Sequence, residues 1–238
     1  MSNASPNFLT SSIGKKFLMG FTGLFLISFL VVHVCINACI YFNDSGATFN
    51  MAAGFMATNI IIRIVEVGLF AGIIIHVVQA LILTMQNNKS RPQKYAVQNL
   101  AVSSKWYSRS MGLLGSLLLM FLVVHLAHFW VPTKIALYGE NAKFVGYNVP
   151  EGFTGVKDNP FESLKTVFSN PIVVVVYLLG LISLFYHLLH GFQSAFRTFG
   201  LTHKKYTPFI KSCGFWYSVI ITLIFASMPI TLYLGIIK

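Results

Sequence analysis

The chain has 238 residues, of which 55% are hydrophobic and only 10% are charged, and its mean hydropathy is +0.71. These values exclude an ordinary soluble domain and indicate an integral membrane protein. The formal net charge of +11 is not taken as a sign of nucleic-acid binding, because basic residues in a membrane protein first of all set its orientation across the bilayer.

Five stretches of the chain are apolar over about 20 residues or more, which is enough to cross a bilayer as helices. In chain order they cover residues 17–42, 60–85, 110–131, 171–196 and 214–236. We therefore predict an all-α integral membrane protein in which residues 1–238 form one transmembrane domain. The first stretch is too long for a signal peptide and should remain in the mature protein. The polar connection 132–170 is predicted to be a surface loop with one short helix around Phe161–Phe168.

The charges are distributed unequally between the two ends of these helices. Five crossings place the N-terminus and the loops 86–110 and 197–213 on one side, where eleven cations occur without an acid: Lys15, Lys16, Lys89, Arg91, Lys94, Lys105, Arg109, Arg197, Lys204, Lys205 and Lys211. All six acids lie on the other side or just inside it: Asp44, Glu66, Glu140, Glu151, Asp158 and Glu162. The positive-inside rule predicts a cytoplasmic N-terminus and an outer C-terminus. The basic loops either set only this topology or also dock an acidic or large soluble partner.

Histidines lie deep inside the apolar stretches. The pentapeptide FLVVH occurs at 29–33 and again at 121–125. In each copy a glycine, Gly23 or Gly115, lies ten residues before the histidine. This glycine would leave room for a flat macrocycle or a neighbouring helix. An ionisable side chain at bilayer depth costs a few kcal/mol on insertion scales, so it normally faces the bundle interior. A single such histidine often makes a hydrogen bond between helices. Here four of the five stretches carry a histidine, which this explanation fits less well. The six are His33, His76, His125, His128, His187 and His190.

The depth of four of these histidines predicts two pairs. At about 1.5 Å per residue, His33 and His125 lie about 24 and 22 Å from the cytoplasmic ends of their helices. On the same scale, His76 and His187 lie about 14 and 15 Å from theirs. Two imidazoles at one level can supply both axial ligands of a haem iron across a bundle core. We therefore expect the first four helices to bundle around two stacked haems.

The histidines and the charged residues of these stretches also allow simpler or different chemistry. The H-x-x-H spacings His125/His128 and His187/His190 suit direct zinc or iron binding, as in a histidine-based metal-ion transporter. That reading lacks the H-E-x-x-H glutamate and an intramembrane carboxylate cluster. Arg63 and Glu66, three residues apart, would in the simplest case form a local ion pair.

Taken in order, several segments resemble one known family. They are SSIGKKFLMGFTG, VVHVCIN, ATFNMAAGFM, IIIHVV, FLVVHL and NPIVVVVYLLGLISLFYH. Together they resemble the di-haem, five-helix cytochrome b membrane subunit of succinate dehydrogenase and fumarate reductase, and the wording of the first helix is closest to forms from the Bacteroidetes. The resemblance covers nearly the whole chain.

The resemblance implies a membrane anchor and electron-transfer subunit of a succinate:quinone oxidoreductase in the bacterial cytoplasmic membrane. A flavoprotein subunit would handle the dicarboxylate, and an iron–sulfur subunit would exchange electrons with this chain. Two noncovalent b haems would connect that subunit to a quinone, expected to be menaquinone. By matching motifs, His33 and His125 would ligate the outer haem, and His76 and His187 the inner haem.

Further site residues are expected from the same resemblance. Cationic or hydroxyl partners near the cytoplasmic surface would hold the haem propionates, the candidates being Ser11, Ser12, Lys15, Lys105, Arg109 and Arg197. Glu66, Arg63 and His128 are candidate proton-exchanging groups of a quinone site near the outer haem. Because His128 follows His125 by three residues, spacing alone does not choose between them as ligands. A cytochrome b anchor of a hydrogenase or formate dehydrogenase is the closest alternative, but such anchors dock their partner on the outer side.

Overall fold

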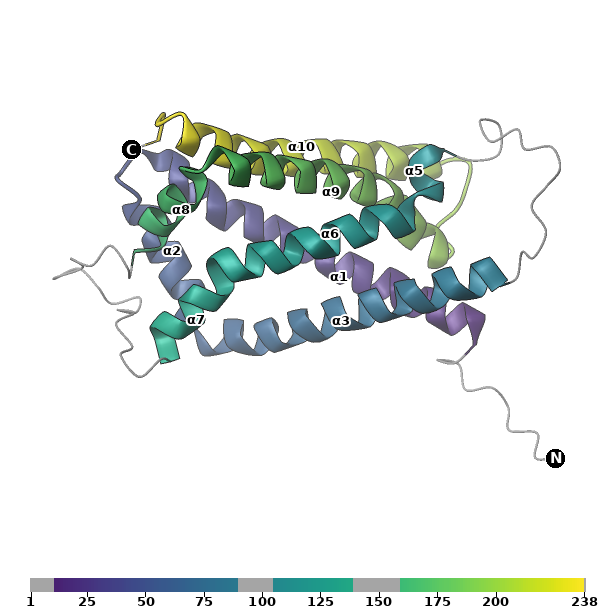
Figure 1. Cartoon of the computed structure of the whole chain (residues 1–238). Helices are drawn as coiled ribbons and strands as arrows, with labels where there is room; N and C mark the ends of the chain where they lie inside the picture. Colours follow the sequence, from purple (N-terminus) through teal and green to yellow (C-terminus); the bar gives the residue numbers. More distant parts are fainter. Residues whose placement is uncertain (1–10, 90–104, 139–158, 238) are drawn as a thin grey trace.

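The computed structural model describes residues 11–89, 105–138 and 159–237, and within these ranges all regular structure is helical. Five long helical segments run side by side (Figure 1). They are α1 (Ser12–Ala38), α3 (Ile60–Lys89), the continuous α6–η3–α7 segment (Met111–His125, Leu126–Trp130 and Val131–Tyr138), α9 (Pro171–Thr198) and α10 (Thr207–Tyr233). Each is long and apolar enough to cross a membrane. The prediction of an all-α, multi-pass membrane protein with five transmembrane helices is confirmed.

The two ends of the bundle differ in the elements that they carry (Figure 1). At one end α1, α6 and α10 begin, α3 and α9 finish, and the short helix α5 (Trp106–Arg109) lies beside α9. We call this the basic end, because the described Lys and Arg residues near it have no acidic neighbours in the sequence. The short helices α2 (Ala47–Thr58) and α8 (Pro160–Phe168) lie at the opposite end, which we call the capped end.

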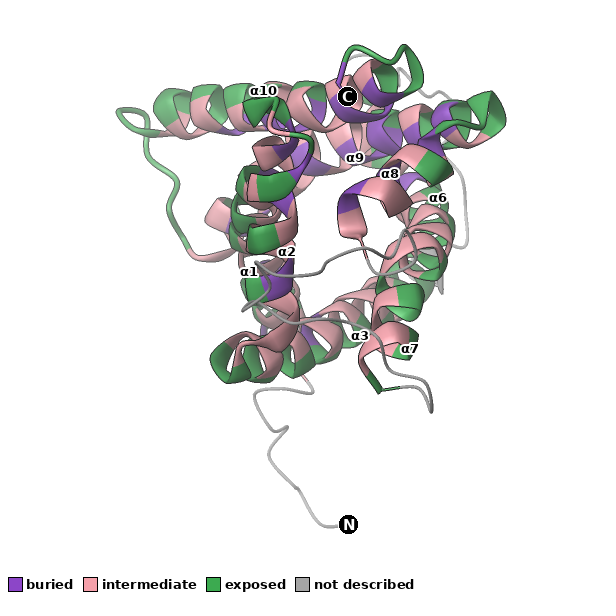
Figure 2. Ribbon diagram, turned by 90° about the vertical axis from the view of Figure 1, so that its left-hand side faces the viewer, coloured by how far each residue is buried: buried purple, intermediate pink, exposed green. Residues whose placement is uncertain are grey.

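The long helices surround a common axis. Seen from the capped end, α1, α3, α6–α7 and α9 lie around it, and α10 lies outside, along α9 and against α1 (Figure 2). Buried side chains concentrate on α9, which packs against α1, α6 and α10. The outward faces of α3 and α6 carry large exposed apolar side chains such as Ile64, Val67, Leu113 and Met120. These faces suit contact with lipid.

The turn into α2 follows the 3₁₀ helix η2 (Cys39–Phe42) and uses left-handed backbone at Asn43, Ser45 and Gly46. Gly46 has φ +80°, and a Cβ on it would meet the ring of Phe161, so no larger residue fits this position. The hydroxyl and the amide of Thr48 both donate to the Asp44 carboxylate, and these bonds lower the pKa of that carboxyl.

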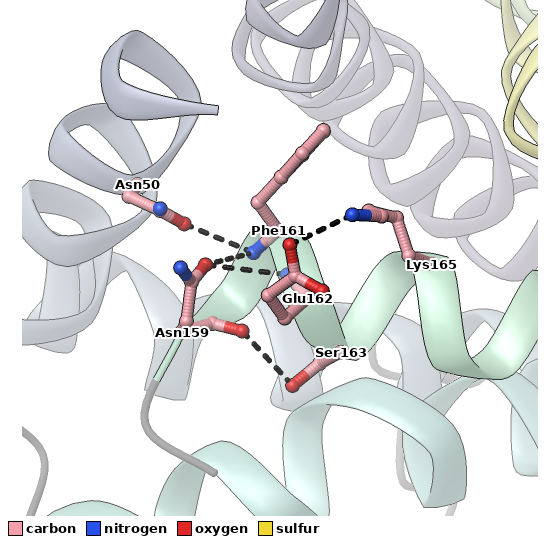
Figure 3. Close-up of polar contacts among 6 residues, drawn as sticks. All are labelled: Asn50, Asn159, Phe161, Glu162, Ser163 and Lys165. Atoms are coloured by element: carbon pink, nitrogen blue, oxygen red, sulfur yellow. Dashed lines mark hydrogen bonds and ion pairs between the residues drawn. The ribbon is translucent and has the colours of Figure 1, made fainter. Parts of the chain in front are cut away.

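Helix α8 closes the capped end through polar contacts of Asn50 and Asn159 with its first turn (Figure 3) and through the buried side chains of Phe161 and Phe168. The Asn159 side chain caps the helix, and its Oδ1 and that of Asn50 on α2 each accept from the Phe161 amide at 2.9 Å. The Phe161 side chain is 1% exposed, and Phe168 packs edge-on against Tyr177 of α9 at 4.9 Å between centroids. The predicted short helix around Phe161–Phe168 is confirmed.

Two predicted helix limits were wrong. The third helix does not stop before Pro132 but continues to Tyr138, because η3 is π-helical: the Val131 amide bonds to the carbonyl of Leu126, five residues back. A proline directly after such a segment is tolerated, since the ordinary hydrogen-bond pattern is already shifted there. The fifth helix begins at Thr207 rather than near 214, with Pro208 in its first turn, where the missing amide costs nothing.

The contact between α6 and α9 depends on Gly180. A Cβ at this position would lie 2.4 Å from the Phe121 ring, whereas a Cβ at Gly191 of the same helix would meet nothing within 4 Å. We expect Gly180→Ala to destabilise the bundle by about 1–3 kcal/mol through overpacking. Gly191→Ala should be neutral or stabilising by up to about 1 kcal/mol, because alanine favours helix. Thermal unfolding in detergent measures both, and equal effects of the two variants would contradict this account.

Candidate functional site

Two pairs of histidine rings face each other inside the bundle. The ring centroids of His33 on α1 and His125 on α6 are 5.8 Å apart with an interplanar angle of 84°. Those of His76 on α3 and His187 on α9 are 6.2 Å apart at 60°. Metal–imidazole bonds are about 2.0–2.1 Å for zinc, so two such bonds plus the ring offsets put the centroids of opposed ligands roughly 6 Å apart. Both pairs have the spacing of imidazoles that share one metal ion.

The pairs lie on two levels, and the glycines of the sequence pattern connect these levels. A Cβ on Gly23 would lie 3.6 Å from Cε1 of His76, and a Cβ on Gly115 would lie 3.9 Å from Cε1 of His187. Each glycine precedes the histidine of its own helix by ten residues, so the two levels are about 15 Å apart. The room that each glycine leaves is therefore used by an imidazole of the other level.

The hydrogen bonds of the four rings are unequal. Nδ1 of His76 lies 3.0 Å from the Thr22 hydroxyl, and Nδ1 of His33 lies 3.3 Å from the Asn37 amide nitrogen. Nδ1 of His125 and Nδ1 of His187 are buried, and neither has a hydrogen-bond partner in the described part of the chain. Each pair therefore contains one imidazole with a partner on Nδ1 and one without.

The donor set fits haem iron. Each level offers two imidazoles from different helices, and the described residues contain no cluster of three or more His, Cys, Asp or Glu side chains that could hold a metal ion. Aromatic rings flank the His33–His125 pair, which is called the outer pair after the sequence prediction, as His76–His187 is called the inner pair. Phe29 stacks on His33, and Phe121 stacks on His125. Two opposed nitrogen ligands with apolar walls are what bis-histidine haem ligation requires.

The π-helical segment η3 separates His128 from His125. The ring of His125 faces His33, whereas Nδ1 of His128 lies 3.0 Å from the hydroxyl of Tyr177, and these two rings are stacked 5.8 Å apart. The wider π turn rotates His128 further from His125 than α-helical spacing predicts. Spacing alone left both histidines as possible partners of His33, depth and the repeated FLVVH favoured His125, and the structure brings His125 to His33.

The two charged candidates of the outer site have other partners. Glu66 pairs with Lys134 of α7 at 2.8 Å and accepts a hydrogen bond from the Trp130 indole. Arg63 lies over the Tyr138 ring at 4.7 Å. The prediction of a local Arg63–Glu66 ion pair was wrong, because the extended third helix brings Lys134 to the carboxylate. The structure thus engages Glu66, Arg63 and His128 with three different partners.

A cavity of about 400 Å³ opens near the basic end between α1, α3 and α9. Its lining combines two cations, two hydroxyls and two apolar side chains: Lys16, Met19, Leu83, Ser194, Arg197 and Thr198. Of the predicted propionate contacts, Arg197 lines this cavity. Ser11 instead caps α1 by accepting from the Gly14 amide, and Lys105 lies over the Tyr107 ring. Ser12, Lys15 and Arg109 are placed near the same end, at the start of α1 and in α5.

Several residues of the site were missed by the sequence reasoning. Thr22 and Tyr177 are hydrogen-bond partners of histidines, and Lys16, Ser194 and Thr198 line the cavity. Tyr177 had a usable signal: it precedes His187 by ten residues, which places it at the level of the other pair. The others have no pattern of their own and depend on which helix faces they share.

The ion pair between Glu66 and Lys134 should couple α3 to α7. Their side chains are only 23% and 19% exposed, compared with 33% and 39% for Glu162 and Lys165 on α8. A double-mutant cycle with Glu66→Gln and Lys134→Met should give a coupling free energy of about 1–2 kcal/mol. The matched cycle with Glu162→Gln and Lys165→Met should give no more than about 0.5 kcal/mol. Equal coupling in the two cycles would show that burial does not strengthen the first pair.

Comparison with known proteins leaves the function to be argued from these side chains. No protein-family model, curated protein or solved structure matches this chain.

Proposed function

We propose that this chain is the di-haem cytochrome b subunit of a succinate:quinone oxidoreductase and anchors that complex in the bacterial cytoplasmic membrane. The observation that carries the proposal is the arrangement of four histidines from four helices in two opposed pairs, with centroids 5.8 and 6.2 Å apart. His33 and His125 hold one b haem, and His76 and His187 hold the other. Bound haem iron supplies reversible one-electron transfer.

The charged surface suggests where the soluble subunits bind. Lys105, Arg109, Arg197 and the loop residues Lys204 and Lys205 lie near the basic end, next to the level of His76 and His187. An iron–sulfur subunit docked there would lie next to the haem that His76 and His187 would hold, and the His33–His125 pair lies about 15 Å further along the axis. This arrangement favours a cytoplasmic partner over the outer docking of hydrogenase and formate dehydrogenase anchors.

The cavity at the basic end suits an anionic group with an apolar body. Arg197 and Lys16 supply charge, and Ser194 and Thr198 supply hydroxyl donors. Leu83 follows His76 by seven residues, so the cavity lies about 10 Å from that ring along α3. These four side chains would hold the propionates of a haem bound by His76 and His187 through charge-assisted hydrogen bonds.

The proposed quinone site lies near the outer pair. The His128–Tyr177 pair is a polar group inside the bundle next to His125, with ring centroids of Tyr177 and His125 6.1 Å apart. It can exchange a hydrogen bond or a proton with menaquinone. The ion pair with Lys134 gives the Glu66 carboxylate a structural role in holding α7. A role of Glu66 in proton exchange is secondary to this one.

The proposal is tested by haem content. Purified protein should contain two haems b per chain by pyridine haemochrome quantitation, with the sharp α and β bands of low-spin bis-histidine haem in a reduced-minus-oxidised spectrum. A histidine-based metal-ion transporter would show no such bands. One haem or none in fully loaded protein would refute the proposal.

Separate substitutions should distinguish the two neighbouring histidines of the third helix. His125→Ala should remove one of the two haems, because His33 loses its opposed ligand. His128→Ala should keep both haems and slow quinone turnover by about tenfold, the effect of one lost hydrogen bond of about 1–1.5 kcal/mol. Haem quantitation and quinone reductase assays measure these effects. If His128→Ala loses a haem and His125→Ala does not, the assignment is reversed.

Charge reversal should test the docking surface. Replacing Lys204, Lys205 and Lys211 together by Glu should release the soluble subunits at physiological salt, because a complementary charged contact becomes repulsive. The haem content of the membrane fraction should not change. Reversal of Lys165 at the capped end is the control and should leave assembly intact. Unchanged co-purification of the triple variant would show that these cations set only topology.

A further inference from the structure

The two FLVVH helices share more than this pentapeptide. Residues 19–33 of α1 and 111–125 of α6 are identical at nine of fifteen positions, which are the initial Met-Gly, the second glycine, one leucine and Phe-Leu-Val-Val-His. In both copies a Cβ on the second glycine would come within 4 Å of an imidazole of another helix, that of His76 for Gly23 and that of His187 for Gly115. The two copies therefore place equivalent glycines next to the two rings of the inner pair.

The copies differ at the residue just before this glycine. It is Thr22 in the first copy and Leu114 in the second, and both side chains are buried. The Thr22 hydroxyl lies 3.0 Å from Nδ1 of His76, whereas Nδ1 of His187 has no partner among the described residues. The two imidazoles of one pair thus have different hydrogen bonding.

The proton of the Thr22 hydroxyl decides the state of the His76 ring. Its oxygen lies 2.9 Å from the Leu18 carbonyl and 3.1 Å from the Met19 carbonyl, and carbonyls only accept. When the hydroxyl donates to Leu18, its oxygen is left to accept from Nδ1–H of His76. That arrangement satisfies every group and leaves the lone pair on Nε2 of His76.

We propose that Thr22 is a positioning residue that fixes His76 as the Nδ1–H tautomer, makes it the more basic ligand of the inner pair, and lowers the reduction potential of the inner haem. The inference rests on the proposed function. A hydrogen bond accepted from the remote nitrogen raises the basicity of a ligating imidazole and fixes its orientation. A more basic ligand stabilises the oxidised iron, which carries the higher charge.

Three variants of the intact complex test this role. Thr22→Val keeps the shape and removes the hydroxyl, Thr22→Ser keeps the hydroxyl, and Thr222→Val is the matched control. Thr222 is equally buried, in α10, and its hydroxyl bonds to the carbonyls of Ser218 and Val219 of its own helix. Optical redox titration of the purified complex measures both haem midpoints, and pyridine haemochrome measures haem content.

In Thr22→Val one of the two midpoints should rise and the other should stay, with two haems retained, while Thr22→Ser and Thr222→Val should match the wild type. Loss of one haem from Thr22→Val alone also supports the role, because the shape of the side chain is unchanged. Unmoved midpoints in Thr22→Val, or an equal change in Thr22→Ser, would overturn the role of Thr22 while leaving the proposed function intact. A wild-type complex without haem would overturn both.

Discussion

The cost of placing imidazoles inside an apolar bundle is the constraint on which the rest of this structure depends. A buried polar ring must find a partner or remain a source of instability. Four of the long helices meet this need in the same way, because each turns one histidine toward a histidine of another helix. The helix faces are thereby fixed in rotation and in height, and the apolar side chains on the remaining faces are left for lipid.

Small residues make this arrangement sterically possible. The requirement is strict at Gly180, where a Cβ would clash with the Phe121 ring that stacks beside His125, whereas a Cβ at Gly23 or Gly115 would only reach van der Waals contact with His76 or His187. In lipid, helices gain little from hydrophobic association, so close backbone approach and van der Waals contact decide the packing. The same glycines therefore position the rings and hold the helices together.

The sequence predicted the levels of the histidines because the rise of an α-helix is constant and each long helix runs between the same two ends of the bundle. It did not predict the side to which His128 turns, because a single π turn, which has no clear sequence pattern, changes the rotation of everything after it. Pro132 was read as a helix end for the same reason. The partner of Glu66 was also missed, since Lys134 is 68 residues away and joins it only through tertiary packing. Local periodicity thus predicted the helices and the pairs, and long-range contacts decided the remaining groups.

The two ends of the bundle differ in the side chains that lie near each histidine pair. At the capped end, the α8 side chains Phe161 and Phe168 are buried, and the Tyr177 ring contacts both Phe168 and His125. At the basic end, the cavity between α1, α3 and α9 is lined by Lys16 and Arg197. The polar lining at the basic end and the aromatic packing at the capped end thus give the two levels different surroundings. The repeated segments of α1 and α6, which run in the same direction, supply both imidazoles of one level and the glycines next to the imidazoles of the other. Both levels therefore present two imidazoles, and they differ in the polar residues around these rings.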